Sequence, residues 1–127
     1  MRNPSPVVAV LDDEPEMRKA LRRLLTCRQL RVEEYHSAEQ LLAALISHSP
    51  DCLLLDLQMP EMNGFALLEN FQSRHLHLPV IVITAHDEPD TAQRVKALGA
   101  FAYLKKPVDG SALFDAIQAA LDSTLKS

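Results

Sequence analysis

Short runs of apolar residues alternate along the chain with longer segments in which apolar residues recur every three or four positions. The short runs are typical of buried strands, and the periodic segments are typical of amphipathic helices. The expected strands cover residues 7–11, 31–35, 51–56, 80–84 and 101–104. The expected helices begin near Pro15, Ser37, Asn63, Asp87 and Asp109, which are residue types that favour a helix start.

The regular alternation of strands and helices predicts an α/β protein with one parallel sheet. Right-handed crossovers between parallel neighbours place helices on both faces of such a sheet. Five strands with one reversal in their order predict the flavodoxin-like, doubly wound (βα)5 fold with strand order 2-1-3-4-5. A chain of 127 residues fits a single domain (1–127), whose core we expect at about residues 6–122.

The second and fourth expected helices differ in the apolar residues that they offer to the sheet. The apolar face of the second helix consists of Leu41, Leu42, Leu45 and Ile46. The fourth helix offers Ala92, Val95 and Leu98, and Gly99 ends it as a left-handed cap. Because few buried apolar contacts mean low local stability, we expect the fourth helix to be a mobile element.

Charged and hydroxyl side chains stand at the carboxyl ends of four expected strands. Asp12 and Asp13 follow the first strand, Asp56 ends the third, and Thr84 and Lys106 stand at the ends of the fourth and fifth. In the predicted order the first and third strands are neighbours, and open α/β sheets bind their ligands at this edge. We therefore expect these side chains to form one site.

The chemistry of these side chains points to phosphoryl transfer. Three carboxylates in one place repel one another unless a cation lies among them. Oxygen ligands select a hard divalent ion, which we predict to be Mg²⁺, with Mn²⁺ as a substitute. Lys106 and Thr84 offer donors for phosphoryl oxygens, and the carboxylate of Asp56 can act as the nucleophile. The set predicts transfer of a phosphoryl group to Asp56.

The net charge, the apolar runs and the cysteines limit the partners and the cellular location that we expect. The formal net charge of −4 argues against direct contact with nucleic acid, because such proteins need a basic surface. No apolar run reaches the length of a membrane span, and the two cysteines, Cys27 and Cys52, form no disulfide framework. We interpret both cysteines as small buried residues and expect a cytoplasmic protein without membrane contact.

The chain resembles the receiver domains of bacterial two-component response regulators from Val7 to about Leu121. The resemblance rests on Asp12-Asp13, on Asp56 followed by Met59-Pro60 and Gly64, on Thr84, and on Tyr103-Leu104-Lys105-Lys106-Pro107. Within this family, the chain is most similar to FixJ-type receivers, in the segments Leu11-Asp12-Asp13-Glu14, Val82-Ile83-Thr84 and Lys106-Pro107.

This resemblance implies a role for each group at the sheet edge. Asp56 would accept a phosphoryl group from a sensor histidine kinase, and Lys106 would contact that group. Asp13, Asp56 and the backbone carbonyl of Gln58 would bind Mg²⁺ directly, and Asp12 would act through a bound water. The implied protein is not an enzyme, apart from catalysing its own phosphorylation and dephosphorylation.

The resemblance also implies a switch. The hydroxyl of Thr84 would move to the phosphate, the ring of Tyr103 would follow inward, and the bond between Lys106 and the following proline would be cis. The surface of the fourth helix, fifth strand and fifth helix would then control a homodimer or an attached DNA-binding domain outside this chain, in transcription regulation. Gln58 and His86 should flank the hydrolytic water and set the lifetime of the phosphoaspartate.

Three other functions use parts of this pattern. A pseudo-receiver acts through protein contacts without phosphorylation, and the complete set of pocket residues argues against it. A magnesium-dependent phosphatase would carry a second aspartate two residues after the nucleophile, where this chain has Gln58. A cofactor-binding domain would need a glycine-rich phosphate loop, and none of the three glycines lies in one.

Each of these residues also has a simpler role when it is taken alone. An aspartate at a strand end most often caps the next helix. Glu14 could be a third acidic ligand, but a charge at a helix start is the simpler interpretation. His75 and His77 have a metal-like spacing, but without a nearby companion ligand they are typical of a surface loop. The convergence of several groups at one edge is what predicts a site.

Overall fold

The computed structural model describes residues 6–57, 59, 64–85 and 88–125. In this part of the chain, five strands form one parallel sheet in the order β2-β1-β3-β4-β5, which confirms the predicted topology. The strands are β1 (Val7–Leu11), β2 (Arg31–Tyr35), β3 (Cys52–Asp56), β4 (Val80–Thr84) and β5 (Ala102–Lys105). The helices are α1 (Pro15–Thr26), α2 (Ala38–Ser47), α3 (Gly64–Ser73), α4 (Thr91–Ala97) and α5 (Gly110–Leu125).

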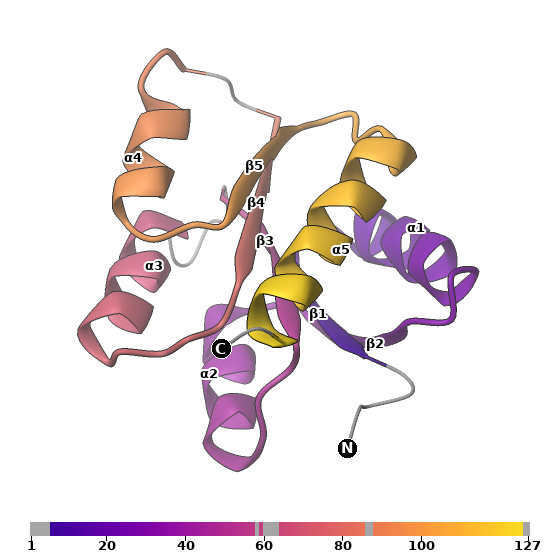
Figure 1. Ribbon diagram of the computed structural model, residues 1–127, viewed down its shortest axis with the longest axis horizontal. Helices are drawn as coiled ribbons and strands as arrows, with labels where there is room; N and C mark the ends of the chain where they lie inside the picture. The colour runs from indigo at the N-terminus through magenta and orange to yellow at the C-terminus, as the bar shows by residue number, and fades with distance from the viewer. Residues whose placement is uncertain (1–5, 58, 60–63, 86–87, 126–127) are drawn as a thin grey trace.

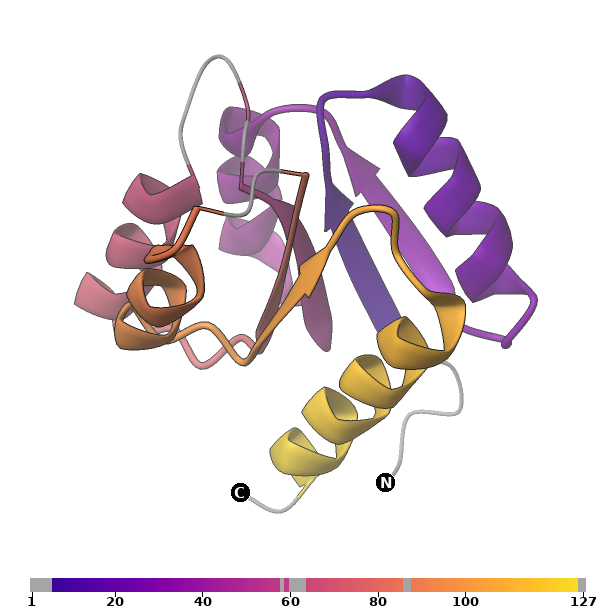
Figure 2. The same ribbon diagram turned by 90° about the horizontal axis from the view of Figure 1, so that it is seen from above.

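Helices cover both faces of the sheet (Figure 1). α1 and α5 lie on one face and α2, α3 and α4 on the other, a division that Figure 2 shows from above. Side chains alternate along each strand, so Val8 and Val10 join the core under α1 and α5, whereas Ala9 and Leu11 join the core under α2, α3 and α4. Because both faces are covered, the central strands β1, β3 and β4 are almost entirely buried.

Local sequence signals explain several helix ends. The hydroxyl of Ser37 accepts a hydrogen bond from the backbone N–H of Gln40 (3.1 Å), and the Gln40 side chain accepts one from the N–H of His36 (3.0 Å). This is the predicted capping box, with the return bond displaced by one residue. Gly99 follows α4 with a φ of 96°, which confirms the left-handed end. The carboxylate of Asp109 accepts a hydrogen bond from the N–H three residues later (3.2 Å).

Three predicted details differ from the structure. α4 begins at Thr91 rather than near Asp87, a residue outside the described part of the chain. Ile46 is 85% exposed, because five residues along a helix rotate it about 140° away from the buried Leu41. Cys27 is exposed at the end of α1, so the prediction that it is buried is wrong.

Cys52 is buried at the start of β3, as the sequence predicts. Burial, reinforced by the charge of the neighbouring Asp51, raises the pKa of the Cys52 thiol to about 12. The thiol is therefore protonated at neutral pH and serves as a small apolar group in the core. Asp51 itself lies just before the strand, where its carboxylate accepts a hydrogen bond from the N–H of Val7 (2.7 Å).

Candidate functional site

Strand register brings the predicted acidic residues to one edge of the sheet. Leu11 of β1 pairs with Leu55 of β3, and each of these residues is followed directly by an aspartate. In parallel strands the residues that follow a pair stay level with each other, so Asp12 and Asp56 meet at the carboxyl ends of neighbouring strands. This edge is where ligands bind to doubly wound sheets.

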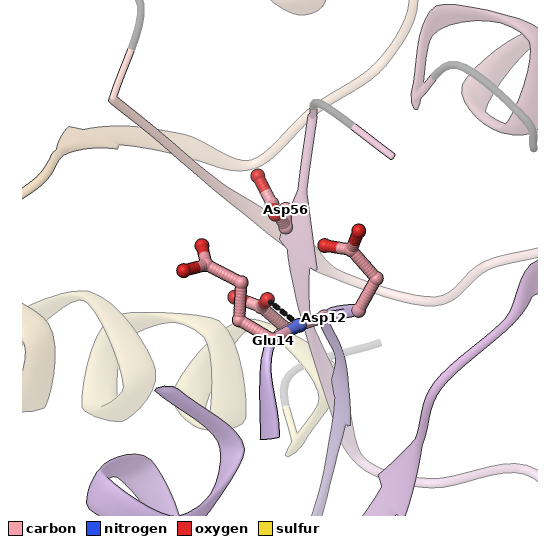
Figure 3. A group of neighbouring side chains, drawn as sticks. Asp12, Glu14 and Asp56 are labelled. Atoms are coloured by element: carbon pink, nitrogen blue, oxygen red, sulfur yellow. Dashed lines mark hydrogen bonds between the residues drawn. The ribbon is translucent and has the colours of Figure 1, made fainter. Parts of the chain in front are cut away.

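Four acidic side chains of the described residues meet at this edge. One carboxylate oxygen from each of Asp12, Asp13, Glu14 and Asp56 lies within 4.8 Å of the others. Asp12 and Asp56 are buried, Asp13 is half-buried and Glu14 is exposed. Figure 3 shows Asp12 and Glu14, from the loop after β1, gathered near Asp56. The sequence predicts three of these residues, and the structure favours the alternative in which Glu14, the third consecutive acid after the strand, joins them.

Lys106 lies among these acids. Its Nζ is 3.3 Å from Asp12 Oδ2, 3.5 Å from Glu14 Oε1 and 3.7 Å from Asp56 Oδ2. Burial lowers the pKa of the Lys106 ammonium, but the charges of Asp12, Asp56 and Glu14 together outweigh burial, and the pKa is raised above its ordinary value. The lysine is therefore cationic at neutral pH and offsets part of the negative charge of the acids.

The loop that carries the acids is fixed by hydrogen bonds to Asp12. The Asp12 carboxylate accepts from the N–H of Glu14 (2.9 Å), and its backbone N–H donates to the carbonyl of Tyr35 (3.2 Å). The carbonyl of Asp12 accepts from the Arg18 guanidinium (2.7 Å), whose Nε also lies 3.7 Å from Glu34 on β2. Sequence reasoning misses Arg18, because a contact with a backbone carbonyl leaves no mark in the pattern of residue types.

Thr84 is the last residue of β4, and Tyr103 lies within β5. Thr84 is fully buried, and its carbonyl accepts a hydrogen bond from the N–H of Lys106 (2.8 Å). Tyr103 is half-buried and packs against the core under α2, α3 and α4. The peptide bond from Lys106 to the following proline is cis, as predicted. Gln58 and His86 lie outside the described residues.

Gly64 brings the start of α3 against the end of β3. Its N–H donates to the carbonyl of Leu57 (3.1 Å), one residue after Asp56. A Cβ atom on Gly64 would lie 2.6 Å from Leu57 Cδ1 and 3.0 Å from Leu57 Cα. No side chain fits this approach without movement, so the glycine fixes the path of the chain beside the site.

The cluster has the chemistry of a site for a hard divalent cation. Its potential ligands are all carboxylate oxygens, which Mg²⁺ and Mn²⁺ prefer to soft sulfur ligands. Asp13 is half-buried, so an ion there can keep water ligands, as Mg²⁺ requires. The residues present therefore fit the predicted metal.

Comparison with known proteins identifies the family. The model of the response regulator receiver domain family matches residues 8–118, which is most of the chain. The chain belongs to this family. The receiver is 44% identical over 103 residues to the DNA-binding transcriptional regulator NtrC of Salmonella typhimurium, covering 81% of this chain and 22% of NtrC. It is 35% identical over 114 residues to the transcriptional regulatory protein FixJ of Azorhizobium caulinodans, covering 90% of this chain and 54% of FixJ.

Solved structures agree with this assignment. The crystal structure of FixJ-N aligns with a TM-score of 0.86 at 33% identity and covers 96% of each chain. A CheY-like receiver domain protein of Methanospirillum hungatei aligns with a TM-score of 0.88 at 24% identity, which supports the fold alone. The predicted likeness to FixJ-type receivers is confirmed, and NtrC has the higher sequence identity of the two relatives. None of the described helices is long and apolar enough to cross a membrane.

The receiver spans about half the length of FixJ and about a fifth of the length of NtrC. Both relatives are named as transcriptional regulators. The family membership makes this chain a signalling domain of the two-component type.

Proposed function

We propose that this receiver accepts a phosphoryl group on Asp56 from a sensor histidine kinase, in a reaction that depends on Mg²⁺. The observation that carries the proposal is the position of Asp56, whose buried carboxylate lies 3.7 Å from the Lys106 ammonium and within the acidic cluster. A cation and a metal ion beside one carboxylate neutralise the charge that develops during in-line transfer. In this proposal residues 1–127 form one receiver domain, with its core at about 6–122.

The transfer uses the Asp56 carboxylate as the nucleophile. One carboxylate oxygen attacks the phosphorus of the kinase phosphohistidine and forms a P–O bond. The P–N bond breaks, and the imidazole leaves with the electron pair and takes up a proton. Lys106 contacts one phosphoryl oxygen, and the Thr84 hydroxyl donates to another. In dephosphorylation, water attacks the phosphorus, the P–O bond to Asp56 breaks, and inorganic phosphate leaves. We propose no other enzymatic activity.

The metal-binding residues follow from the same proposal. When bound, Mg²⁺, or Mn²⁺ in its place, supplies positive charge to the phosphoryl oxygens. Asp13, Asp56 and the backbone carbonyl of Gln58 hold the ion directly, and Asp12 acts through a water. Two observations support this indirect role of Asp12. Its carboxylate is buried and accepts a hydrogen bond from the N–H of Glu14, so it is fixed in the loop.

The output follows from a switch between the end of β4 and the side chain of Tyr103 in β5. Thr84 turns its hydroxyl toward the phosphoryl group, the Tyr103 ring moves inward, and the surface of α4, β5 and α5 changes its affinity for partners. That surface supports a homodimer or controls a DNA-binding output domain outside this chain. Transcription regulation as the output is supported by the relatives NtrC and FixJ, which are both named as transcriptional regulators.

Gln58 and His86 set the lifetime of the phosphoaspartate in this proposal. Substituting both residues and following dephosphorylation tests their role, and an unchanged rate would contradict it.

The phosphoacceptor is tested by intact-mass measurement after incubation with acetyl phosphate and Mg²⁺, in which acetate leaves instead of imidazole. The wild type should gain one phosphoryl group, and Asp56→Asn should gain none. Asp51→Asn is the matched control, because Asp51 lies just before the opposite end of the same strand, and this variant should react like the wild type. Chelation of Mg²⁺ should prevent the gain. A wild type that stays unmodified would favour a pseudo-receiver.

A further inference from the structure

The carboxylate of Glu14 contacts Lys106 at the acidic site and does not cap the helix that Glu14 begins. It is the N-cap residue of α1, with extended backbone angles (φ −89°, ψ 113°), as expected for the residue before Pro15. The side chain makes no capping hydrogen bond to the described start of the helix. Its Oε1 lies instead 3.5 Å from Lys106 Nζ, although the two residues are 92 positions apart.

The surroundings of Lys106 distinguish Glu14 from the other two acids. The side chains of Asp12 and Asp56 are 4% and 5% exposed, whereas the Glu14 side chain is 66% exposed. Glu14 therefore contacts the ammonium from the solvent side, where a phosphoryl donor must approach. Its backbone is held in place by the hydrogen bond from its N–H to Asp12 Oδ1 (2.9 Å).

An ammonium group has three N–H donors, and three carboxylates surround that of Lys106. A phosphoryl oxygen that binds Lys106 competes with these carboxylates for its N–H donors, two of which are used by the hydrogen bonds to Asp12 (3.3 Å) and Glu14 (3.5 Å). Replacing Glu14 costs least, because an exposed ion pair is weak and the released carboxylate is hydrated by solvent. Displacing Asp12 would instead break a shorter contact (3.3 Å) to a buried carboxylate, and Asp56 is the residue that receives the phosphoryl group.

We infer that Glu14 is a positioning residue, which holds Lys106 at the mouth of the site and competes with the incoming phosphoryl group for its ammonium. This inference rests on the proposed function of Asp56. Glu14 thus limits the rate of phosphorylation, and its release from Lys106 accompanies entry of the phosphoryl group.

Three variants separate this contact from a general effect of charge. Glu14→Gln removes the charge, whereas Glu14→Asp keeps it but is one methylene shorter and favours capping the helix. With acetyl phosphate and saturating Mg²⁺, both variants should be phosphorylated roughly two- to fivefold faster than the wild type, the range for one largely exposed ion pair. Glu16→Gln makes the same charge change on an exposed residue in the first turn of α1 and should leave the rate unchanged.

Binding of beryllium fluoride with saturating Mg²⁺ provides a second readout, because this phosphoryl mimic binds without transfer of a phosphoryl group. Its affinity should rise in Glu14→Gln and Glu14→Asp by the same factor as the rate. Wild-type rates and affinities in both variants would overturn the inference. A change in Glu14→Gln alone would also overturn it, because the effect would then be one of charge. If the wild type accepted no phosphoryl group, the proposed function itself would fail.

Discussion

α1 and α4 lie on opposite faces of the sheet and are attached to it very differently. α1 has 12 residues, buries Leu21 and Leu25, and is joined to Glu34 of β2 by Arg18 (3.7 Å) and Arg22 (2.7 Å). α4 has 7 residues and buries Thr91 and Val95. α1 therefore buries larger apolar side chains than α4 and has ion pairs to the sheet in addition.

The described contacts of α4 with α3 are weak. Arg94 stacks on the ring of Phe65 at 3.8 Å, and Gln72 donates a long hydrogen bond (3.4 Å) to the carbonyl of the last residue of α4. Arg18 of α1, in contrast, donates a 2.7 Å hydrogen bond to the carbonyl of Asp12 in the acidic loop. The comparison indicates that the acidic loop of the site is tied to a firmly held helix, whereas the surface proposed to switch includes a loosely held one.

Core truncations should show the largest difference between the two helices. Leu25→Ala should lower the free energy of unfolding by about 2–5 kcal/mol, because the leucine is fully buried. Val95→Ala should cost about 1–2 kcal/mol, since it removes fewer buried carbons. Urea denaturation measures both, with Ile46→Ala as an exposed control that should change stability by less than about 0.5 kcal/mol. If Val95→Ala lowered the free energy of unfolding more than Leu25→Ala, α4 would be held more firmly than α1, which would contradict the comparison.

The close approach of Gly64 to Leu57 should make the first residue of α3 sensitive to substitution. Gly64→Ala should destabilise the protein by about 1–3 kcal/mol, because its Cβ would collide with Leu57. Gly110→Ala is the matched control, since a Cβ there would meet Leu24 at an ordinary 3.9 Å. This control should be neutral or stabilise by up to about 1 kcal/mol, as urea denaturation can show. Equal stability of the two variants would mean that the close approach at Gly64 does not exist.

The contact between Arg94 and Phe65 should control the local opening of α4. Arg94→Ala should cost roughly 0.5–1 kcal/mol and should speed hydrogen exchange of α4 amides more than that of α1 amides. Arg28→Ala removes a similar contact on the other face, where Arg28 lies 4.1 Å from the Phe114 ring, and should leave exchange in α4 unchanged. Uniformly faster exchange in Arg94→Ala would argue against a separately mobile α4.

The smallest effect is expected from the charge of Lys106 at alkaline pH. Its pKa is raised in the folded protein, so the ammonium contributes stability that is fully present below its ordinary pKa of 10.5. That contribution is lost as the pH rises through the raised value. In metal-free urea denaturation, the difference in stability between the wild type and Lys106→Met should therefore shrink above pH 10.5. A difference that grows there would show that the carboxylates do not hold the ammonium.

The sequence predicts the fold well because the central strands carry an unambiguous signal. Runs such as Val80–Thr84 are short, rich in β-branched residues and buried on both faces, which favours a strand over a helix. The start of α4 is predicted four residues early, because its sparse apolar residues do not mark where it begins. Ile46 shows a second limit of prediction from sequence. It is apolar like its buried neighbours, so residue type alone does not reveal that it lies outside the buried face of α2.

The candidate site is predictable as far as topology determines it. Asp56 ends β3 and Asp12 follows the neighbouring β1, so the strand order brings these two together and places Lys106, which follows β5, at the same edge of the sheet. The contact of Glu14 with Lys106 depends on side-chain reach and on the backbone before a proline, and the contact of Arg18 with Asp12 ends on a backbone carbonyl. Neither contact produces a periodic pattern along the chain.

The most direct test of the account is a crystal structure of the receiver with Mg²⁺ and beryllium fluoride. We expect beryllium fluoride on the Asp56 carboxylate, the metal ion bound by Asp13 and Asp56, and Lys106 within hydrogen-bond distance of a fluoride. A metal ion bound away from Asp56, or a Lys106 ammonium directed away from the fluorides, would contradict it.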